Sequence, residues 1–213
     1  NNLEELDMTY GTWLLLARNI FSLTEYSKYC VDRGFLFECK HMPVVDANVA
    51  PAIINWEKLR KMELITVEQA IQIYGYMQTK TRVKWGFKKK LQALHPMEKI
   101  SMERLTREFG LITTDPWHIA MGLIDKQTVE YFKAALLRGE KMLAEPRIKI
   151  STIHGVKGGE ADNVVILPDM ALRTYEEAQV KPDEETRVWY VGVTRTRKNL
   201  YWLQPRTQYF YQL

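Results

Sequence analysis

Two stretches in the last third of the chain contain residue types that could bind a nucleotide or a phosphate. The first, Ile150–Glu160 (ISTIHGVKGGE), has three glycines, which let the backbone approach a ligand closely. Thr152 and His154 supply hydrogen-bond donors, Lys157 a cation, and Glu160 a carboxylate suited to sugar hydroxyls. The glycines alone are weak evidence, because a glycine-rich segment is more often only a turn. The stretch is not a P-loop, since no glycine in the chain is followed by Lys-Ser or Lys-Thr.

The second stretch, Glu184–Arg197 (EETRVWYVGVTRTR), predicts a helix that ends close to an arginine. Arg195 would lie near the end of this helix, which its valines anchor in the core. An arginine held in this way can direct a planar, permanently charged guanidinium at a phosphate. The residues alone leave an alternative open, in which the arginines pair with Glu184 and Glu185 on a solvent-exposed face.

Together the two stretches resemble motifs V and VI of the UvrD/Rep-like superfamily 1 DNA helicases, in the order found in that family. Motif V reads like T-x-H-x-x-K-G-x-E and motif VI like E-E-x-R-x-x-Y-V-x-x-T-R. The residues that match are Thr152, His154, Lys157, Gly158 and Glu160 in motif V, and Glu184, Glu185, Arg187, Tyr190, Val191, Thr194 and Arg195 in motif VI. Arg18, which follows the apolar run Trp13–Ala17, resembles the arginine of motif IV.

The resemblance implies a nucleotide site in the complete protein, which would use ATP and Mg²⁺. Arg195 would be the arginine finger that reaches the γ-phosphate, and Arg18 a second cationic contact to the same phosphate. Glu160, beside Gly159, would bind the ribose of the nucleotide.

The resemblance also implies a grip on single-stranded DNA. Thr152 and His154 would contact the DNA backbone, and Lys157 would support their loop. Arg187 and Glu185 would be structural, with Arg187 tying the motif VI helix through an ion pair. The expected DNA partners are single strands and junctions between single and double strands.

Three departures from the family pattern qualify these expectations. Relatives often have an adenine-stacking tyrosine before the motif IV arginine, where this chain has Ala17. The segment Gly159–Asp162 lacks the usual aromatic residue after the glutamate and is closer to phage-type or other divergent members. A Walker A loop and an Asp-Glu site for Mg²⁺ are absent. We therefore expect a C-terminal part of an ATP-dependent helicase, inactive alone, whose partner is an N-terminal RecA-like domain of the same polypeptide.

The surrounding elements predict an α/β fold, a RecA-like parallel sheet interrupted by an all-helical insertion. The predicted sheet domain is 1–62 and 146–213, and the helical subdomain is 63–145. The predicted strands are 13–17, 35–38, 148–153, 163–167 and 200–203; the predicted helices are 23–33, 52–62, 66–77, 81–94, 101–109, 126–143 and 184–196.

The insertion has a basic segment, since Gln69–Met97 contains no acidic residue and six positive charges. If 81–94 is one helix, Lys84, Trp85 and Lys88 lie off its apolar stripe, which suits contact with phosphates and bases of DNA. A solvated helix face with Trp85 half-buried explains the pattern equally well.

Composition narrows the class of protein. With 46% hydrophobic and 26% charged residues, the chain can fold around a core, which excludes disorder as a description of the whole. The longest apolar run, Trp13–Ala17, is far shorter than the ~18 residues of a membrane span. Two cysteines and four scattered histidines favour a cytoplasmic protein without a bound metal. The competing hypothesis is a non-catalytic module of helicase fold that binds single strands, against which an intact motif VI argues.

Overall fold

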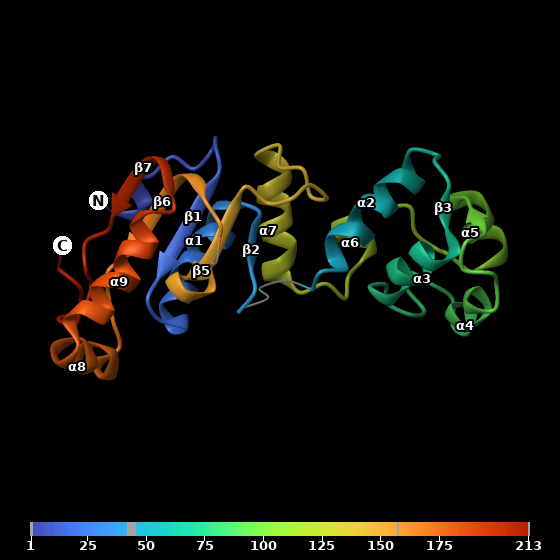
Figure 1. The fold of residues 1–213 in the computed structure, drawn as a ribbon. Helices are drawn as coiled ribbons and strands as arrows, with labels where there is room; N and C mark the ends of the chain where they lie inside the picture. The colour runs from blue at the N-terminus through green and yellow to red at the C-terminus, as the bar shows by residue number, and fades with distance from the viewer. Residues whose placement is uncertain (1, 42–45, 157, 213) are drawn as a thin grey trace. The chain divides into compact units, whose positions relative to one another are not determined.

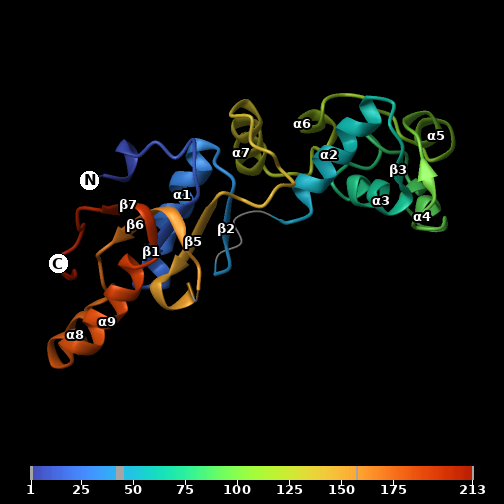
Figure 2. The same cartoon turned by 45° about the horizontal axis from the view of Figure 1, so that its top comes forward.

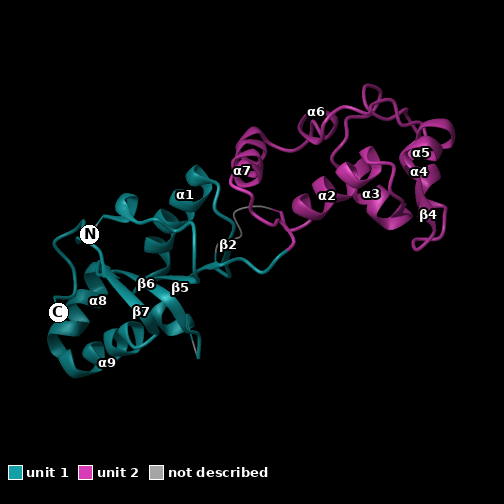
Figure 3. Ribbon diagram, turned by 90° about the horizontal axis from the view of Figure 1, so that it is seen from above, with its two compact units in different colours: residues 1–44, 144–213 teal, residues 45–143 magenta. Residues whose placement is uncertain are grey.

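The computed structural model describes residues 2–41, 46–156 and 158–212, which form two compact units (Figures 1 and 3). Unit 1 comprises residues 1–44 and 144–213, and unit 2 comprises residues 45–143. The second unit therefore begins at residue 45, whereas the sequence predicted a helical subdomain that begins at residue 63. The reason is helix α2 (Val49–Arg60), which hydrogen-bonds within unit 2: Trp56 Nε1 donates to the carbonyl of Asp115 at 2.9 Å, and Arg60 Nε donates to that of Thr114 at 3.2 Å.

Unit 1 is built on a five-stranded sheet of order β2-β5-β1-β6-β7, in which every neighbouring pair is parallel. The strands are β1 (Trp13–Ala17), β2 (Phe37–Cys39), β5 (Ile148–Thr152), β6 (Ala161–Leu167) and β7 (Thr196–Trp202). The predicted α/β class with a parallel sheet is confirmed. Ala17 lies opposite both Thr152 and Leu167, so β1, β5 and β6 end at one edge of the sheet.

Helices α1 (Leu23–Arg33) and α9 (Pro182–Val193) cover opposite faces of this sheet (Figure 2). Alternate residues of the fully buried strand β1 point to opposite faces: Leu15 packs in the core under α1, and Leu14 packs with Trp189 of α9. The predicted helix 23–33 is confirmed, and Gly34 ends it with φ of 69°. Unit 1 also contains η1 (Leu3–Glu5), η2 (Ile20–Ser22), η3 (Ile153–Gly155) and α8 (Leu172–Val180).

Unit 2 is mainly helical. Besides α2 it contains α3 (Val67–Gly75), α4 (Phe87–Gln92), α5 (Met102–Glu108), α6 (Trp117–Ala120) and α7 (Lys126–Leu137). The prediction of an all-helical insertion was wrong in one respect, because β3 (Ile65–Thr66) and β4 (Lys99–Ile100) form a short antiparallel pair. Thr66 caps α3 by accepting the N–H of Gln69, at the start of the predicted helix 66–77.

The predicted helix 81–94 is much shorter in the structure and begins only at Phe87. Residues 82–84 instead run antiparallel to 110–112: Lys84 N–H donates to the carbonyl of Gly110 at 2.8 Å, and Ile112 N–H donates to that of Arg82 at 2.9 Å. No helix in the described part of the chain is both long and apolar enough to cross a membrane.

Candidate nucleotide and nucleic-acid site

The glycine-rich stretch connects the end of β5 to the start of β6. Thr152 is the last residue of β5, and its buried hydroxyl oxygen accepts the N–H of Gly155 at 3.1 Å. His154 is exposed on the turn that this bond closes. Because β5 and β6 are parallel, the connection between them leads from the edge where the strands end (the carboxyl edge) back to the edge where they begin (the amino edge). Lys157 lies outside the described residues.

Gly155 is required at its position by close packing. A Cβ there would lie 2.6 Å from Ser151 Oγ and 3.1 Å from Thr152 Oγ1. We predict that Gly155→Ala lowers the free energy of unfolding by about 1 to 3 kcal/mol, because two short side chains must shift. Urea unfolding measures this loss.

Two variants control that prediction. Ser151→Ala/Gly155→Ala should recover part of the loss, since the nearest atom is removed. Gly75→Ala, at a position with no atom within 4 Å of the added Cβ, should not destabilise the protein. A Gly155→Ala variant as stable as the parent would contradict the packing described.

Helix α9 packs directly on this connection through Gly192. A Cβ at Gly192 would lie 3.4 Å from Cδ1 of both Ile153 and Ile166. Trp189, one helical turn earlier, is 1% exposed and belongs to the same apolar cluster as Ile153. The stretches that resemble motifs V and VI therefore form one packed structure.

The ion pair that holds α9 is made by Arg18. Its Nε and Nη2 atoms donate to the two carboxylate oxygens of Glu185 at 2.8 and 3.0 Å. The Glu185 side chain is 7% exposed, so this bidentate pair is largely withdrawn from water. Arg187, predicted to tie this helix through an ion pair, is exposed and has no acidic partner within the described residues.

His154 lies close enough to this pair to be affected by it. Partial desolvation lowers the pKa of His154, the Arg18 guanidinium lowers it further, and Glu185 opposes these effects. The net effect favours the neutral form of the ring.

We predict that NMR titration gives His154 a pKa below the ordinary value of about 6.5. The Arg18→Met variant should raise it, because the positive charge is removed and the Glu185 carboxylate remains. A His154→Gln variant assigns the resonance. A pKa unchanged by Arg18→Met would contradict the electrostatic contact.

A hollow of about 450 Å³ lies between α9 and the connection. Its floor is apolar, and its polar lining consists of His154, Arg187 and Arg195. Arg195 Nε donates to the carbonyl of Val191 at 3.0 Å, which leaves the terminal N–H groups of the guanidinium for a ligand. Arg18, predicted to share a phosphate with Arg195, does not line this hollow.

Glu160 and Arg195 are neighbours at the amino edge of the sheet. They directly precede Ala161 and Thr196, which pair at the starts of β6 and β7, and the Ala161 N–H donates to the Arg195 carbonyl at 3.1 Å. Arg18 follows Ala17 at the opposite edge. Ala17 lies opposite Leu167, six residues beyond Ala161, which corresponds to about 20 Å along a strand.

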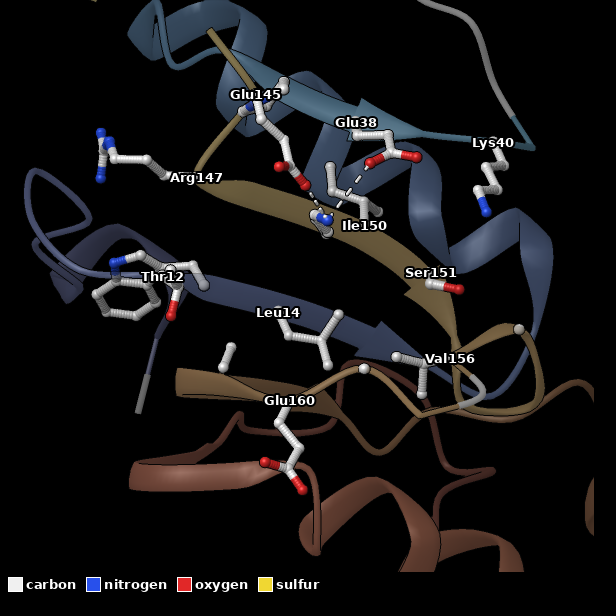
Figure 4. Close-up of a pocket in the computed structure, with 16 residues that line it drawn as sticks. Thr12, Leu14, Glu38, Lys40, Glu145, Arg147, Ile150, Ser151, Val156 and Glu160 are labelled. Atoms are coloured by element: carbon white, nitrogen blue, oxygen red, sulfur yellow. Dashed lines mark hydrogen bonds and ion pairs between the residues drawn. The ribbon is translucent and has the colours of Figure 1, made fainter.

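A second hollow of about 440 Å³ lies over β5 and β1, and Gly159 and Glu160 line it (Figure 4). In Figure 4 the Glu160 carboxylate points away from Leu14 and Ser151 in this hollow. It accepts a hydrogen bond from Arg197 Nε at 3.1 Å, a pairing that the sequence did not predict. A ligand hydroxyl would compete with Arg197 for this exposed carboxylate.

Ala17 is fully buried between the strands. An aromatic side chain at this position would enter the core rather than face a nucleotide. Position 17 is therefore not where this fold would place an adenine-stacking residue.

The comparison with family models agrees with this architecture. Residues 57–204 match the family model described as the UvrD-like helicase C-terminal domain, and the match includes both motif stretches but not Arg18. A comparison with curated proteins finds no match. The matched residues make up more than half of the chain. The chain therefore belongs to the family of UvrD-like helicase C-terminal domains.

Proposed function

We propose that unit 1 completes the ATPase site of an ATP-dependent DNA helicase. The observation that carries this proposal is the placement of Glu160 and Arg195 side by side at the amino ends of β6 and β7. A carboxylate suited to a ribose and a guanidinium suited to a γ-phosphate would thus face one nucleotide. The P-loop and the carboxylates for Mg²⁺ would come from an N-terminal RecA-like domain of the same polypeptide.

In this proposal Arg195 is the catalytic residue of the chain, and Arg187 adds positive charge to the same hollow. Phosphoryl transfer requires charge stabilisation and positioning rather than covalent participation of the protein. Arg195 meets that need because Val191 fixes the guanidinium at Nε. Arg18 is a positioning residue, since its guanidinium is bound to Glu185 and lies toward the other edge of the sheet.

The DNA grip would lie at the carboxyl edge. His154 is exposed there. Thr152 is buried and accepts the Gly155 N–H, so in this proposal it holds the turn that presents His154. Residues 153–160 and α9 link this edge to Glu160 and Arg195. Closure of the two motor domains on ATP would therefore shift the grip on the strand.

The test is DNA-stimulated ATP hydrolysis by the complete polypeptide. His154→Ala should raise the concentration of single-stranded DNA needed for half-maximal stimulation and leave the unstimulated rate unchanged. Arg173→Ala, on the exposed face of α8, is the control and should change neither quantity. If His154→Ala had the DNA dependence of the parent, the proposed grip would be wrong.

A further inference from the structure

A loop in unit 2, here called the Trp85 loop (residues 83–87), presents a tryptophan ring to solvent. Trp85 is 78% exposed, whereas Trp13, Trp56, Trp117 and Trp189 are each at most 5% exposed and Trp202 is half-buried. The ring is exposed because residues 82–84 pair with 110–112 and the chain then turns at Gly86, with φ of 82°. Trp85 is therefore not a core residue of unit 2.

The Trp85 loop is fixed on both sides of the ring. Before it, Val83 is fully buried opposite Leu111, and the Lys84 N–H donates to the Gly110 carbonyl at 2.8 Å. After it, Phe87 packs so closely on Gly110 that a Cβ there would lie 2.7 Å from the Phe87 ring. A ligand that stacks on the ring would not have to order this backbone first.

The six cations of the basic segment fall into two groups. Three are occupied: Arg82 pairs with Asp115 at 2.7 Å, Lys88 Nζ donates to the Met77 carbonyl at 2.9 Å, and Lys90 Nζ donates to the Glu108 carbonyl at 3.0 Å. Burial also lowers the pKa of Lys88. The predicted DNA contact of Lys88 would require its ammonium to leave the Met77 carbonyl. The others, Lys80, Lys84 and Lys89, are exposed and have no ion-pair partner in the described part of the chain.

The acidic residues that follow in the sequence pair with arginines rather than with these three lysines. Each acidic side chain between residues 98 and 115 is bound to an arginine: Glu98 and Glu108 to Arg104, Glu103 to Arg107, and Asp115 to Arg82. Lys80, Lys84 and Lys89 are therefore exposed cations that form no ion pair within the described ranges.

We propose that Trp85 with Lys80, Lys84 and Lys89 binds single-stranded DNA, at a site separate from the grip in unit 1. An unpaired base would stack on the indole ring, and the lysines would contact the adjacent phosphates. A single strand is favoured over duplex because the interior of a duplex offers no free base face to a protruding ring. All residues of the proposed site belong to unit 2, so the proposal does not depend on the proposed ATPase mechanism.

The first experiment titrates the 213-residue chain with a twelve-nucleotide oligothymidylate and follows tryptophan fluorescence. Stacking on Trp85 should quench the fluorescence saturably, and Trp85→Phe should abolish the quenching while keeping most of the affinity. Trp85→Ala should weaken binding of a labelled oligomer by about fivefold or more. Its side chain contributes little to the core, so this variant should fold normally.

The second experiment measures the salt dependence of binding. Lys84→Gln/Lys89→Gln should reduce the slope of log affinity against log salt by about 1.4, because about 0.7 is lost per phosphate contact to a single strand. Lys61→Gln/Lys126→Gln removes the same charge from other exposed positions of unit 2 and should keep the parental slope.

Three results would overturn the proposal: no quenching by the single strand, equal losses in both lysine double variants, or duplex binding as tight as single-strand binding and insensitive to Trp85→Ala. His154→Ala separates this site from the grip in unit 1. That variant should leave the quenching of Trp85 fluorescence unchanged. If it also leaves DNA-stimulated hydrolysis unchanged, the grip in unit 1 is wrong, but the Trp85 site is not affected.

Discussion

Replacing Arg195 with alanine in the complete helicase polypeptide is expected to lower the rate of ATP hydrolysis by about 10³-fold or more, with ATP affinity nearly unchanged. Arg195 would contact charge that develops in the transition state, so its loss should act on the rate rather than on ground-state binding. The measurements are the steady-state hydrolysis rate at saturating single-stranded DNA and the equilibrium affinity for a non-hydrolysable ATP analogue.

Two further variants sharpen that experiment. Arg195→Lys keeps the charge but loses the planar fork and the Nε–H bond to Val191, so it should recover only a small part of the rate. Arg173→Ala removes an exposed arginine from α8 and should leave the rate unchanged. Equal hydrolysis rates for Arg195→Ala and the parent would contradict the assignment of the arginine finger.

The second large effect is expected from the ion pair between Arg18 and Glu185. Arg18→Met leaves a carboxylate with 7% side-chain exposure without its partner. We expect the free energy of unfolding to fall by about 3 kcal/mol, as is usual when one member of a buried pair is removed. Urea unfolding of the 213-residue chain measures this loss.

The double variant Arg18→Met/Glu185→Leu tests whether the loss comes from the unpaired carboxylate. It should recover most of the stability, because no buried charge remains. If Arg18 instead served only to contact a phosphate, Arg18→Met would leave stability unchanged and the double variant would show no coupling.

Much of the sheet could be predicted because its signals are local. The run Trp13–Ala17 is uniformly apolar, and the structure buries every residue of it between two helical layers. Gly34 ends α1 where the spacing of apolar residues stops. Residues 150–160 and 184–195 match the family motifs by type and spacing, and these stretches belong to the part of the chain that the family model matches.

The features that the sequence did not indicate depend on segments that are distant along the chain. Arg18 and Glu185 are 167 positions apart, so no local pattern could indicate their ion pair. The distance of Arg18 from Arg195 along the sheet follows from strand register, which places the end of β1 opposite the end of β6.

The basic segment shows the same limit. Its apolar residues have helical spacing, but the pairing of residues 82–84 with 110–112 prevents a helix before Phe87. This pairing exposes Trp85, while the short helix that follows places Lys88 against the Met77 carbonyl. The sequence indicated a basic surface with an aromatic ring, but only the structure shows which lysines are available to a ligand.

Whether this chain completes an ATPase site is tested first by the intact mass of the native polypeptide captured from its source cells. We expect a mass well above the 25.1 kDa of this chain, with a GxxxxGK[ST] loop in the additional sequence. A native product of about 25.1 kDa, captured without any associated P-loop protein, would contradict this expectation. The chain would then be a single-strand-binding module that retains the helicase fold without a motor.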